Sequence, residues 1–261
     1  MNTPLLALHQ VSFAYPGRPI LNRVDFALHA GERVALVGDN GAGKSTLLQL
    51  LVGLHPCTTG HITAFGQDRR EEKAFRDLRL RVGLLFQDPD DQLFCPTVLE
   101  DVAFGPLNQG NSRQQAEAIA QATLATLGIE NFAERVTHKL SGGEKRLVSL
   151  ATVLAMQPEV LLLDEPTSGL DEKSERLLIE HLEGLPQAML FVSHDRRFVE
   201  RLATRAILLQ QGQLSDALLH SHPHTHTHSH LHIHAPDSAH GTVDEQSPTE
   251  HRDHHLAEGE E

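Results

Sequence analysis

The 261-residue sequence has little of several features that mark whole classes of protein. Its only cysteines, Cys57 and Cys95, are too few and too far apart for a disulfide framework or a thiolate zinc site. No apolar run approaches the roughly 20 residues that a membrane-spanning helix needs, and the N-terminus lacks the basic flank of a signal peptide. Positive charge is also scarce: 22 Lys and Arg against 35 Asp and Glu give a net charge of −13, which argues against a nucleic-acid binder. We therefore expect neither a secreted nor an integral membrane protein, whereas peripheral attachment to a membrane stays open.

Short apolar runs alternate with amphipathic segments from residue 4 to about residue 219. The runs are residues 34–38, 83–86, 160–164, 188–193 and 205–210. Such runs are typical of strands buried on both faces of a parallel sheet. The amphipathic segments, which predict helices, are residues 44–54, 112–127, 142–155 and 172–182. The alternation predicts an α/β fold with a mainly parallel core sheet, and helix signals from about 88 to 157 predict a helical subdomain.

Histidine is the one residue type in marked excess, and it is concentrated at the C-terminal end. Of 19 histidines, seven lie before residue 219 and the others lie in residues 220–261. Eight recur at every second position: His220, His222, His224, His226, His228, His230, His232 and His234. Acidic residues dominate the remainder. Because this segment has too little apolar surface to offset its chain entropy, we predict that residues 220–261 are a disordered tail in the absence of a ligand.

A glycine-rich stretch directly follows the first apolar run and fits the pattern G-x-x-x-x-G-K-S. Its residues are Gly38, Asp39, Asn40, Gly41, Ala42, Gly43, Lys44, Ser45 and Thr46. It lies between a predicted strand and a predicted helix, which is the context that a phosphate-binding loop requires. Its glycines allow backbone amides to curl around phosphates at the helix N-terminus. We expect Lys44 to reach the β- and γ-phosphates and the Ser45 hydroxyl to ligate Mg²⁺.

A second motif supplies carboxylates for the same site. The apolar run at 160–164 ends in Asp164, and Glu165 follows it. Asp164 can hold Mg²⁺ through water, and Glu165 can orient or deprotonate an attacking water. Alone, this pair would fit a solvated strand end equally well. Together with the phosphate loop, it predicts a nucleotide hydrolase.

One further motif is rare outside a single family. Leu140-Ser141-Gly142-Gly143-Glu144 resembles the LSGGQ signature of ATP-binding cassette (ABC) ATPases, with Glu144 where most cassettes have Gln. In the family the signature contacts nucleotide mainly at the positions of Ser141 and Gly143, so this departure need not disable the site. The resemblance covers residues 4 to about 219. It implies a P-loop NTPase fold of ABC type, with an antiparallel β part at the N-terminus.

The family's other motifs follow in order along the chain. Gln87 looks like the Q-loop glutamine, Asp171 like the D-loop aspartate and His194 like the switch histidine. Tyr15 precedes Lys44 by 29 residues (44 − 15), about where the family places an aromatic residue that stacks on adenine. The catalytic set that the resemblance implies is Glu165, His194 and Gln87. The magnesium set that it implies is Ser45, Gln87 and Asp164.

A single cassette leaves the far side of the γ-phosphate without an obvious partner. In the family, the signature of a second subunit fills this gap, so residues 141–144 would act in trans. ATP then holds a head-to-tail pair together, and hydrolysis loosens it. Because this chain contains one cassette, the second copy must come from another chain, and we expect a homodimer.

The segment after Gln87 narrows the family further. Residues 87–94 (QDPDDQLF) and 96–108 (PTVLEDVAFGPLN) resemble the ATPase subunits of energy-coupling-factor importers, which take up vitamins or transition-metal ions. Leu93, Phe94, Val98 and Phe104 predict an exposed docking surface, with ordinary packing for some of them. The resemblance implies a peripheral protein on the cytoplasmic face of a membrane. Its partners would be a transmembrane coupling subunit and a membrane metal-binding subunit.

The histidine-rich tail favours a metal cargo. Neutral imidazole is a suitable ligand for Ni²⁺, Co²⁺, Cu²⁺ and Zn²⁺. Histidines two apart in an extended chain lie on one side at roughly 6.6 Å intervals. We predict that the tail contacts metal and that the cargo is nickel or cobalt, with nickel slightly ahead. The alternative for the tail is a solubilising low-complexity end, and the alternative cargo is a vitamin.

Two other classes of protein also combine some of these features. A soluble nickel-insertion GTPase joins a phosphate loop to a histidine-rich segment, but it needs an N-K-x-D motif, and no asparagine after Asn2 is followed by lysine. A cassette ATPase of DNA repair or translation is disfavoured by the net charge of −13, the single cassette and the lack of a coiled-coil insertion. Both remain weaker hypotheses than an importer ATPase.

Overall fold

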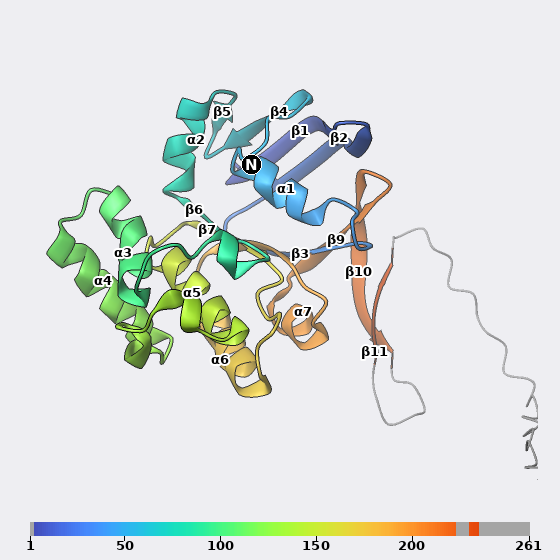
Figure 1. Cartoon of the computed structure of the whole chain (residues 1–261). Helices are drawn as coiled ribbons and strands as arrows, with labels where there is room; N and C mark the ends of the chain where they lie inside the picture. The colour runs from blue at the N-terminus through green and yellow to red at the C-terminus, as the bar shows by residue number, and fades with distance from the viewer. Residues whose placement is uncertain (1–2, 223–229, 235–261) are drawn as a thin grey trace, which may run out of the picture.

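The structure is a computed structural model that describes residues 3–222 and 230–234, and it is built around two β-sheets (Figure 1). The larger sheet has seven strands in the order β11-β10-β9-β3-β8-β7-β6. Its strands are β3 (Arg33–Val37), β6 (Val82–Leu85), β7 (Val160–Asp164), β8 (Ala188–Val192), β9 (Arg205–Gln210), β10 (Gln213–His222) and β11 (His230–His234). The five strands from β9 to β6 are parallel, and these are the five apolar runs of the sequence. The expected mainly parallel core is therefore confirmed.

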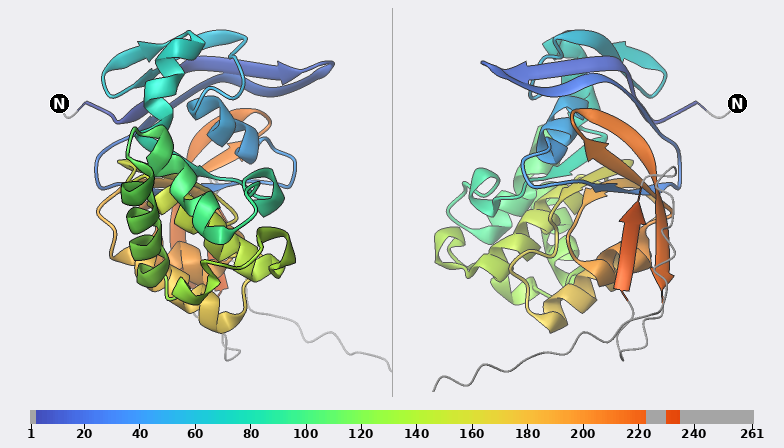
Figure 2. Two further views of the ribbon diagram at one scale, coloured as in Figure 1. Left: turned by 60° about the vertical axis from the view of Figure 1, so that its left-hand side comes forward. Right: turned by 90° about the vertical axis from the view of Figure 1, so that its right-hand side faces the viewer.

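The smaller sheet is antiparallel and comes from the N-terminal part of the chain, as expected. Its strand order is β2-β1-β4-β5. The strands are β1 (Leu6–Tyr15), β2 (Arg18–Leu28), β4 (Thr59–Ala64) and β5 (Gln67–Arg69). This sheet lies on one side of the core sheet, and the helices from α3 to α7 lie on the other (Figure 2).

Seven α-helices occur in the described part of the chain. They are α1 (Lys44–Leu51), α2 (Glu72–Arg79), α3 (Val98–Asn108), α4 (Arg113–Thr126), α5 (Gly142–Leu154), α6 (Glu172–Glu183) and α7 (Arg196–Leu202). Short 3₁₀ turns lie at Pro89–Asp91, Glu130–Phe132 and Thr137–Lys139. Between β6 and β7 the chain is entirely helical or irregular, which matches the expected helical segment. None of these helices is both long and apolar enough to cross a bilayer.

The core sheet separates two hydrophobic clusters. Leu162 and Leu190 face the antiparallel sheet and α1, while Leu161, Leu163 and Phe191 face the helices on the other side. Successive residues of a strand point to opposite faces, so a strand covered on both sides must be apolar at every position. This double burial explains why β7 reads as the continuous run VLLLD.

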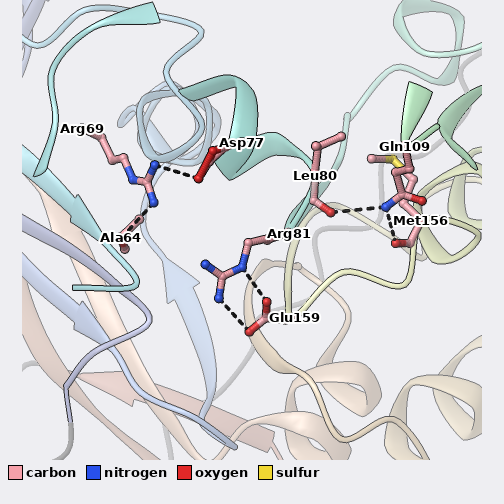
Figure 3. A network of polar contacts seen from close by, with 8 residues as sticks. All are labelled: Ala64, Arg69, Asp77, Leu80, Arg81, Gln109, Met156 and Glu159. Carbon is pink, nitrogen blue, oxygen red and sulfur yellow. Dashed lines mark hydrogen bonds and ion pairs between the residues drawn. The ribbon is translucent and has the colours of Figure 1, made fainter. Parts of the chain in front are cut away.

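Polar contacts join the layers where β6 begins (Figure 3). Arg81 pairs with Glu159, and its guanidinium lies 3.4 Å from the Phe65 ring centroid. The Gln109 side chain, just after α3, donates to the carbonyl of Met156 at 2.8 Å. The first contact joins the residues just before β6 and β7, and the second joins the end of α3 to the residues that follow α5.

The C-terminal strands differ from the expectation of an unpaired tail from residue 220. β10 continues three residues past 219, to His222, and β11 pairs with it in antiparallel register. Alternation of histidine with Ser, Leu and Ile is compatible with a strand, and antiparallel pairing satisfies the backbone groups of both segments. The rest of the predicted tail, residues 223–229 and 235–261, lies outside the described residues.

Candidate nucleotide site

A cleft of about 810 Å³ lies where the carboxyl ends of β3, β7 and β8 meet. In an open α/β sheet, ligands bind at this edge, because the loops that leave parallel strands converge there. The lining includes Tyr15, most of the glycine-rich loop, Gln87, Asp164, Glu165 and His194. Residues from five separate segments of the sequence are thus brought to one site.

The glycine-rich loop has a shape that side chains would not allow at two positions. A Cβ atom at Gly38 would lie 2.3 Å from the carbonyl oxygen of Leu209, and one at Gly43 would lie 2.4 Å from Cγ2 of Ile20. Gly43 also has φ 105°, in the region that glycine adopts most readily. Helix α1 begins at Lys44 without a side-chain cap. Its first amides are therefore available to bind an anion.

Lys44 is nearly buried and closes the loop on itself. Its Nζ donates to the carbonyl oxygens of Gly38 at 2.8 Å and Asp39 at 3.0 Å. These bonds hold the ammonium group inside the curl of the loop. A phosphate bound there would meet the ammonium and the uncapped amides of α1 together.

Ser45 and Asp164 come from different elements and meet at the base of the cleft. Burial raises the pKa of Asp164, and this is opposed by its hydrogen bond with Ser45 and by the charges of Lys44 and Arg146. A hydroxyl and a carboxylate in contact form the type of oxygen donor set that Mg²⁺ prefers. The pair therefore fits the magnesium site predicted from the sequence.

Glu165 and His194 are also brought together. His194 Nε2 lies 3.3 Å from one carboxylate oxygen of Glu165, and the His194 backbone amide donates to the other at 3.3 Å. Glu165 has φ 49°, an uncommon conformation for a non-glycine residue and one that clusters at functional sites. Its amide donates to the carbonyl of Val192 at 3.0 Å, which fixes this backbone against β8.

Tyr15, at the end of β1, lies on the rim of the same cleft. Its hydroxyl lies 3.4 Å from Thr46 Oγ1 and 3.3 Å from His55 Nε2. The side chain stays partly exposed, and Phe13 packs edge-on against the ring. The stacking role of this ring on adenine stays a prediction.

Gln87 is exposed in the cleft, and its backbone is held by a residue that sequence reasoning missed. Arg146 of α5 is buried and donates to the carbonyl of Phe86 at 2.6 Å and to the carbonyl of Gln87. Burial lowers the pKa of Arg146, while the charges of Asp164 and nearby acids favour its protonated form. No motif marks Arg146, because it lies between Lys145 and Leu147 in what the sequence presents as an ordinary helix.

The signature residues do not line the cleft. Ser141 caps α5. The Glu144 amide donates to the Ser141 hydroxyl at 3.3 Å, and the Ser141 amide donates to the Glu144 carboxylate at 2.8 Å. A Cβ at Gly143 would lie 3.0 Å from the carbonyl of Gly169, whereas Gly142 has open space. The helix N-terminus at Gly142 thus has open space beside it and lies outside the lining of the cleft.

Glu144, the departure from the usual signature, has a partner. Its carboxylate pairs with both terminal nitrogens of Arg135 at 2.6 and 3.2 Å. This pairing lowers the pKa of Glu144 to about 2. The ion pair explains how a charged residue is accommodated where most cassettes carry an amide.

The remaining predicted residues have local roles that the sequence did not specify. Asp171 caps α6 by accepting from the amides of Lys173 and Ser174, each at 3.0 Å. The cleft also includes residues that were not among the predicted site residues, namely Arg18, Ile20, Thr167, Ser168, Glu175, Val192 and Asp195. Among the tail histidines, His220 and His222 lie in β10, and His230, His232 and His234 lie in β11. His224, His226 and His228 lie outside the described residues.

Comparison with known proteins places this cleft in a family. The model of the family described as "ABC transporter" matches residues 21–168, which span the glycine-rich loop, the signature and the carboxylate pair. The chain belongs to the ABC transporter family, as the motifs predicted. Members use ATP and Mg²⁺ and hydrolyse ATP to drive transport.

Relatives of this chain include proteins named for metal import. The nickel import ATP-binding protein NikO of Rhodobacter capsulatus is 43% identical over 226 residues, covering 82% of this chain and 89% of NikO. The cobalt import ATP-binding protein CbiO of the same organism is 45% identical over 220 residues, covering 81% of this chain and 78% of CbiO. A relative from Brucella suis, named as an ABC transporter ATP-binding protein without a cargo, is 56% identical over 219 residues and covers 84% of this chain and 91% of its own length.

Solved structures resemble the whole cassette. One is cbiO1 from Clostridium perfringens, described as part of the ABC transporter complex cbiONQ. It is 32% identical to this chain with a TM-score of 0.70, and the match covers 81% of this chain and 86% of the cbiO1 chain. Another is a dimeric ATP-binding cassette in a post-hydrolysis state with ADP and phosphate. It is 25% identical with a TM-score of 0.75 and covers 81% of this chain and 98% of its own.

Proposed function

We propose that this chain is the ATP-hydrolysing energy-coupling subunit of a membrane importer for a divalent transition-metal ion, nickel or cobalt. The observation that carries the ATPase part is the cleft, where the phosphate loop, the Ser45–Asp164 pair and the Glu165–His194 pair surround one space. The chain acts at the cytoplasmic face of the membrane, as a peripheral subunit.

Each residue of the cleft has a role that its position supports. Lys44 leaves the loop carbonyls to bind the β- and γ-phosphates of ATP, and the α1 amides bind the same phosphates. Ser45 and Asp164, with Gln87, hold Mg²⁺, which neutralises phosphate charge when bound. Glu165 orients and deprotonates the attacking water, and His194 holds the Glu165 carboxylate in place on the γ-phosphate side of the cleft.

The signature acts on the site of a second chain. Since Ser141 and the N-terminus of α5 lie outside the cleft, this helix N-terminus is placed to meet phosphate from a partner cassette. Two copies therefore associate head to tail around two ATP molecules. The dimeric arrangement of the related cassette of solved structure supports this pairing.

The segment after the Q-loop supplies the surface for a transmembrane partner. Phe94 and Phe104 stack edge to face at 4.8 Å, and their side chains are 66% and 43% exposed. Val98, in contrast, is fully buried, and Leu93 packs against the core of the helical segment. The docking surface is thus limited to Phe94 and Phe104, and the other two apolar residues of the predicted set serve ordinary packing.

A buried carboxylate holds this docking surface in place. One oxygen of Asp101 accepts from the amides of Phe94 and Cys95 at 3.1 and 2.9 Å. Its other oxygen accepts from the Thr137 hydroxyl at 3.1 Å. With its backbone fixed, Phe94 can present its exposed ring to a partner at a low entropic cost.

The cargo assignment rests on relatives and on the tail. NikO and CbiO match this chain about equally, so they support a metal cargo without separating nickel from cobalt. The sequence of alternating histidines from His220 to His234 adds a candidate contact for the same ions. A vitamin is the alternative cargo, and a soluble nickel-insertion NTPase is the weaker alternative function.

Metal uptake by the assembled transporter tests the proposal. The chain is purified with its membrane partners and reconstituted into vesicles, and ATP-dependent accumulation of Ni²⁺ and Co²⁺ is measured. We expect accumulation of one or both ions by the wild type and none by Glu165→Gln. Accumulation of a vitamin without either ion would contradict the cargo assignment, and failure to co-purify any membrane protein would contradict the transporter assignment.

A further inference from the structure

Arg135 carries the guanidinium group that lies against the start of the signature helix α5. It comes nine residues before Glu144, in the irregular segment between the 3₁₀ turns at Glu130–Phe132 and Thr137–Lys139. Its two terminal nitrogens donate to the two carboxylate oxygens of Glu144, at 2.6 and 3.2 Å. A two-pronged contact of this kind fixes the geometry as well as pairing the charges. A positive and a negative charge therefore lie side by side at the first turn of α5.

Other contacts hold Arg135 in place independently of Glu144. Its backbone amide donates to the carbonyl of Phe132 at 2.8 Å, and its guanidinium carbon lies 4.6 Å from the centroid of the Phe132 ring. Its carbonyl accepts from the amide of Val98, the first residue of α3, at 3.1 Å. Because the backbone is fixed and the guanidinium lies over a ring, the side chain loses less freedom when it pairs with the carboxylate.

The negative charge of Glu144 lies where the signature is proposed to meet phosphate. One oxygen of Glu144 accepts from the Ser141 amide at 2.8 Å, which places the carboxylate at the first turn of α5. Gly142, in the same turn, has open space beside it. A phosphate that approaches this turn is attracted by the helix N-terminus and repelled by the carboxylate. Without a compensating cation, Glu144 would oppose the binding that the signature is proposed to perform.

We propose that Arg135 is a positioning residue for the ATP-driven pairing of two chains: it neutralises Glu144 and so keeps the N-terminus of α5 able to accept the γ-phosphate of ATP bound to a second copy. This inference rests on the proposed action of the signature in trans, and it adds the residue that makes a charged signature compatible with phosphate. Arg135 acts through Glu144 and does not itself have to touch the nucleotide.

A double substitution separates this charge balance from a purely structural role of the ion pair. Arg135→Met removes the positive charge but keeps a long apolar side chain against Phe132, so Glu144 is left uncompensated. Adding Glu144→Gln removes the negative charge as well and keeps a side-chain oxygen for the helix cap. If the ion pair served only the fold, the second substitution would not repair the effect of the first.

Both changes are made in the full-length Glu165→Gln chain, which is expected to retain bound ATP. The control is Arg113→Met in the same background, because Arg113 forms an exposed ion pair with Glu117 on α4 and its removal changes the net charge equally. Light scattering gives the ATP concentration at which half of the chains are dimeric. Thermal unfolding of each variant reports on the fold separately.

We expect Arg135→Met to raise this ATP concentration on the order of 10-fold, because the partly exposed carboxylate repels phosphate over a short distance. Adding Glu144→Gln should restore the value of the Glu165→Gln chain, and Arg113→Met should leave that value unchanged. An unchanged value in Arg135→Met would overturn the inference. A rise that Glu144→Gln does not reverse would also overturn it, since Arg135 would then support the fold or touch phosphate itself.

Failure of the proposed function gives a different result in the same experiment. ATP-bound monomers of the Glu165→Gln chain, before any change at Arg135, would overturn the pairing of two chains through the signature and this inference with it.

Discussion

At the scale of single residues, the proposed chemistry depends on one carboxylate, Glu165, held in an uncommon backbone conformation. Glu165 follows the buried strand β7, and its side chain is fixed by two contacts to His194. The neighbouring Asp164 is more deeply buried and meets Ser45. Adjacent carboxylates thus have different surroundings, which suits different tasks: one holds a cation and the other handles a water.

Replacement of Glu165 by Gln tests its role as the base. The variant keeps the shape of the side chain, so ATP binding should persist while phosphate release slows by about 10²- to 10⁴-fold, the range that a general base contributes. Glu117→Gln, on the exposed face of α4, is the control and should leave turnover unchanged. Phosphate release by the assembled transporter is the measurement. Wild-type turnover in Glu165→Gln would assign the base to another group.

The Glu144–Arg135 ion pair predicts a pH-dependent stability difference. Arg135 lowers the pKa of Glu144 to about 2, which is below the pKa of this group in the unfolded chain. The ionised carboxylate therefore stabilises the fold at pH values above its unfolded pKa, and this contribution is lost as the pH falls toward 2. Glu144→Gln keeps the cap on Ser141 but loses the pair. The pair is partly exposed, so the effect is small.

Urea denaturation of wild type and Glu144→Gln at several pH values measures this effect. The wild type should be slightly more stable at neutral pH, and the difference should shrink as the pH falls from about 5 to about 2. ATPase activity should be retained, because Gln is the usual residue in the family signature. A difference that stays constant over this pH range would show that the ion pair does not stabilise the fold.

The site residues that the sequence predicted are those that lie in contiguous motifs. Lys44, Asp164 and Glu165 were found because a strand, a loop and a helix follow one another around them. Arg146 and Glu175 were not, because their places at the site depend on how α5 and α6 pack against the core. Such placement is a property of the tertiary structure and leaves no local pattern.

At the scale of elements, the parallel strands were easier to predict than the other elements. All five parallel strands were found because burial on both faces makes them continuously apolar. Helices α2 and α7 were missed, and α3 was predicted only as part of the helical segment from about 88 to 157. In α3, Gly105 and Pro106 suggest a break, yet both lie inside the helix. The capping box of Thr97 and Glu100 at its start was the available signal.

The docking segment makes a prediction about one exposed side chain. Phe94→Asp should weaken co-purification with the transmembrane subunit, because it places a charge in the centre of the Phe94–Phe104 pair. Stability should change by less than about 0.5 kcal/mol, as is usual for exposed positions. Leu54→Asp, at another exposed apolar residue, is the control and should leave co-purification intact. Equal loss of nucleotide binding and co-purification in Phe94→Asp would show that Phe94 supports the core instead.

At the scale of the whole molecule, the cassette should fold without its histidine-rich end. Deleting residues 220–261 removes β11 and the last three residues of β10, but leaves the pairing of β10 with β9. Thermal unfolding and basal ATP hydrolysis should therefore be nearly unchanged, whereas Ni²⁺ binding by the isolated chain should fall steeply. If the number of Ni²⁺ ions bound per chain is unchanged by the deletion, the cassette binds the metal, which would contradict the role assigned to the tail.

The proposed nucleotide site is divided between two parts of the chain. The cleft contains the groups proposed to bind and attack ATP, and the signature residues at the start of α5 are not among the residues that line it. In the proposed function, the site is completed by the signature of a second copy. The central claim is therefore that ATP joins two chains through Ser141 of each.

Light scattering of Glu165→Gln with and without ATP tests this claim most directly. Because the variant binds ATP without hydrolysing it, we expect monomers in the absence of ATP and dimers in its presence. Adding Ser141→Arg to the same chain places a bulky cation at the N-terminus of α5, and this double variant should bind ATP yet remain monomeric. ATP-dependent dimers of the double variant, or ATP-bound monomers of Glu165→Gln, would contradict the account.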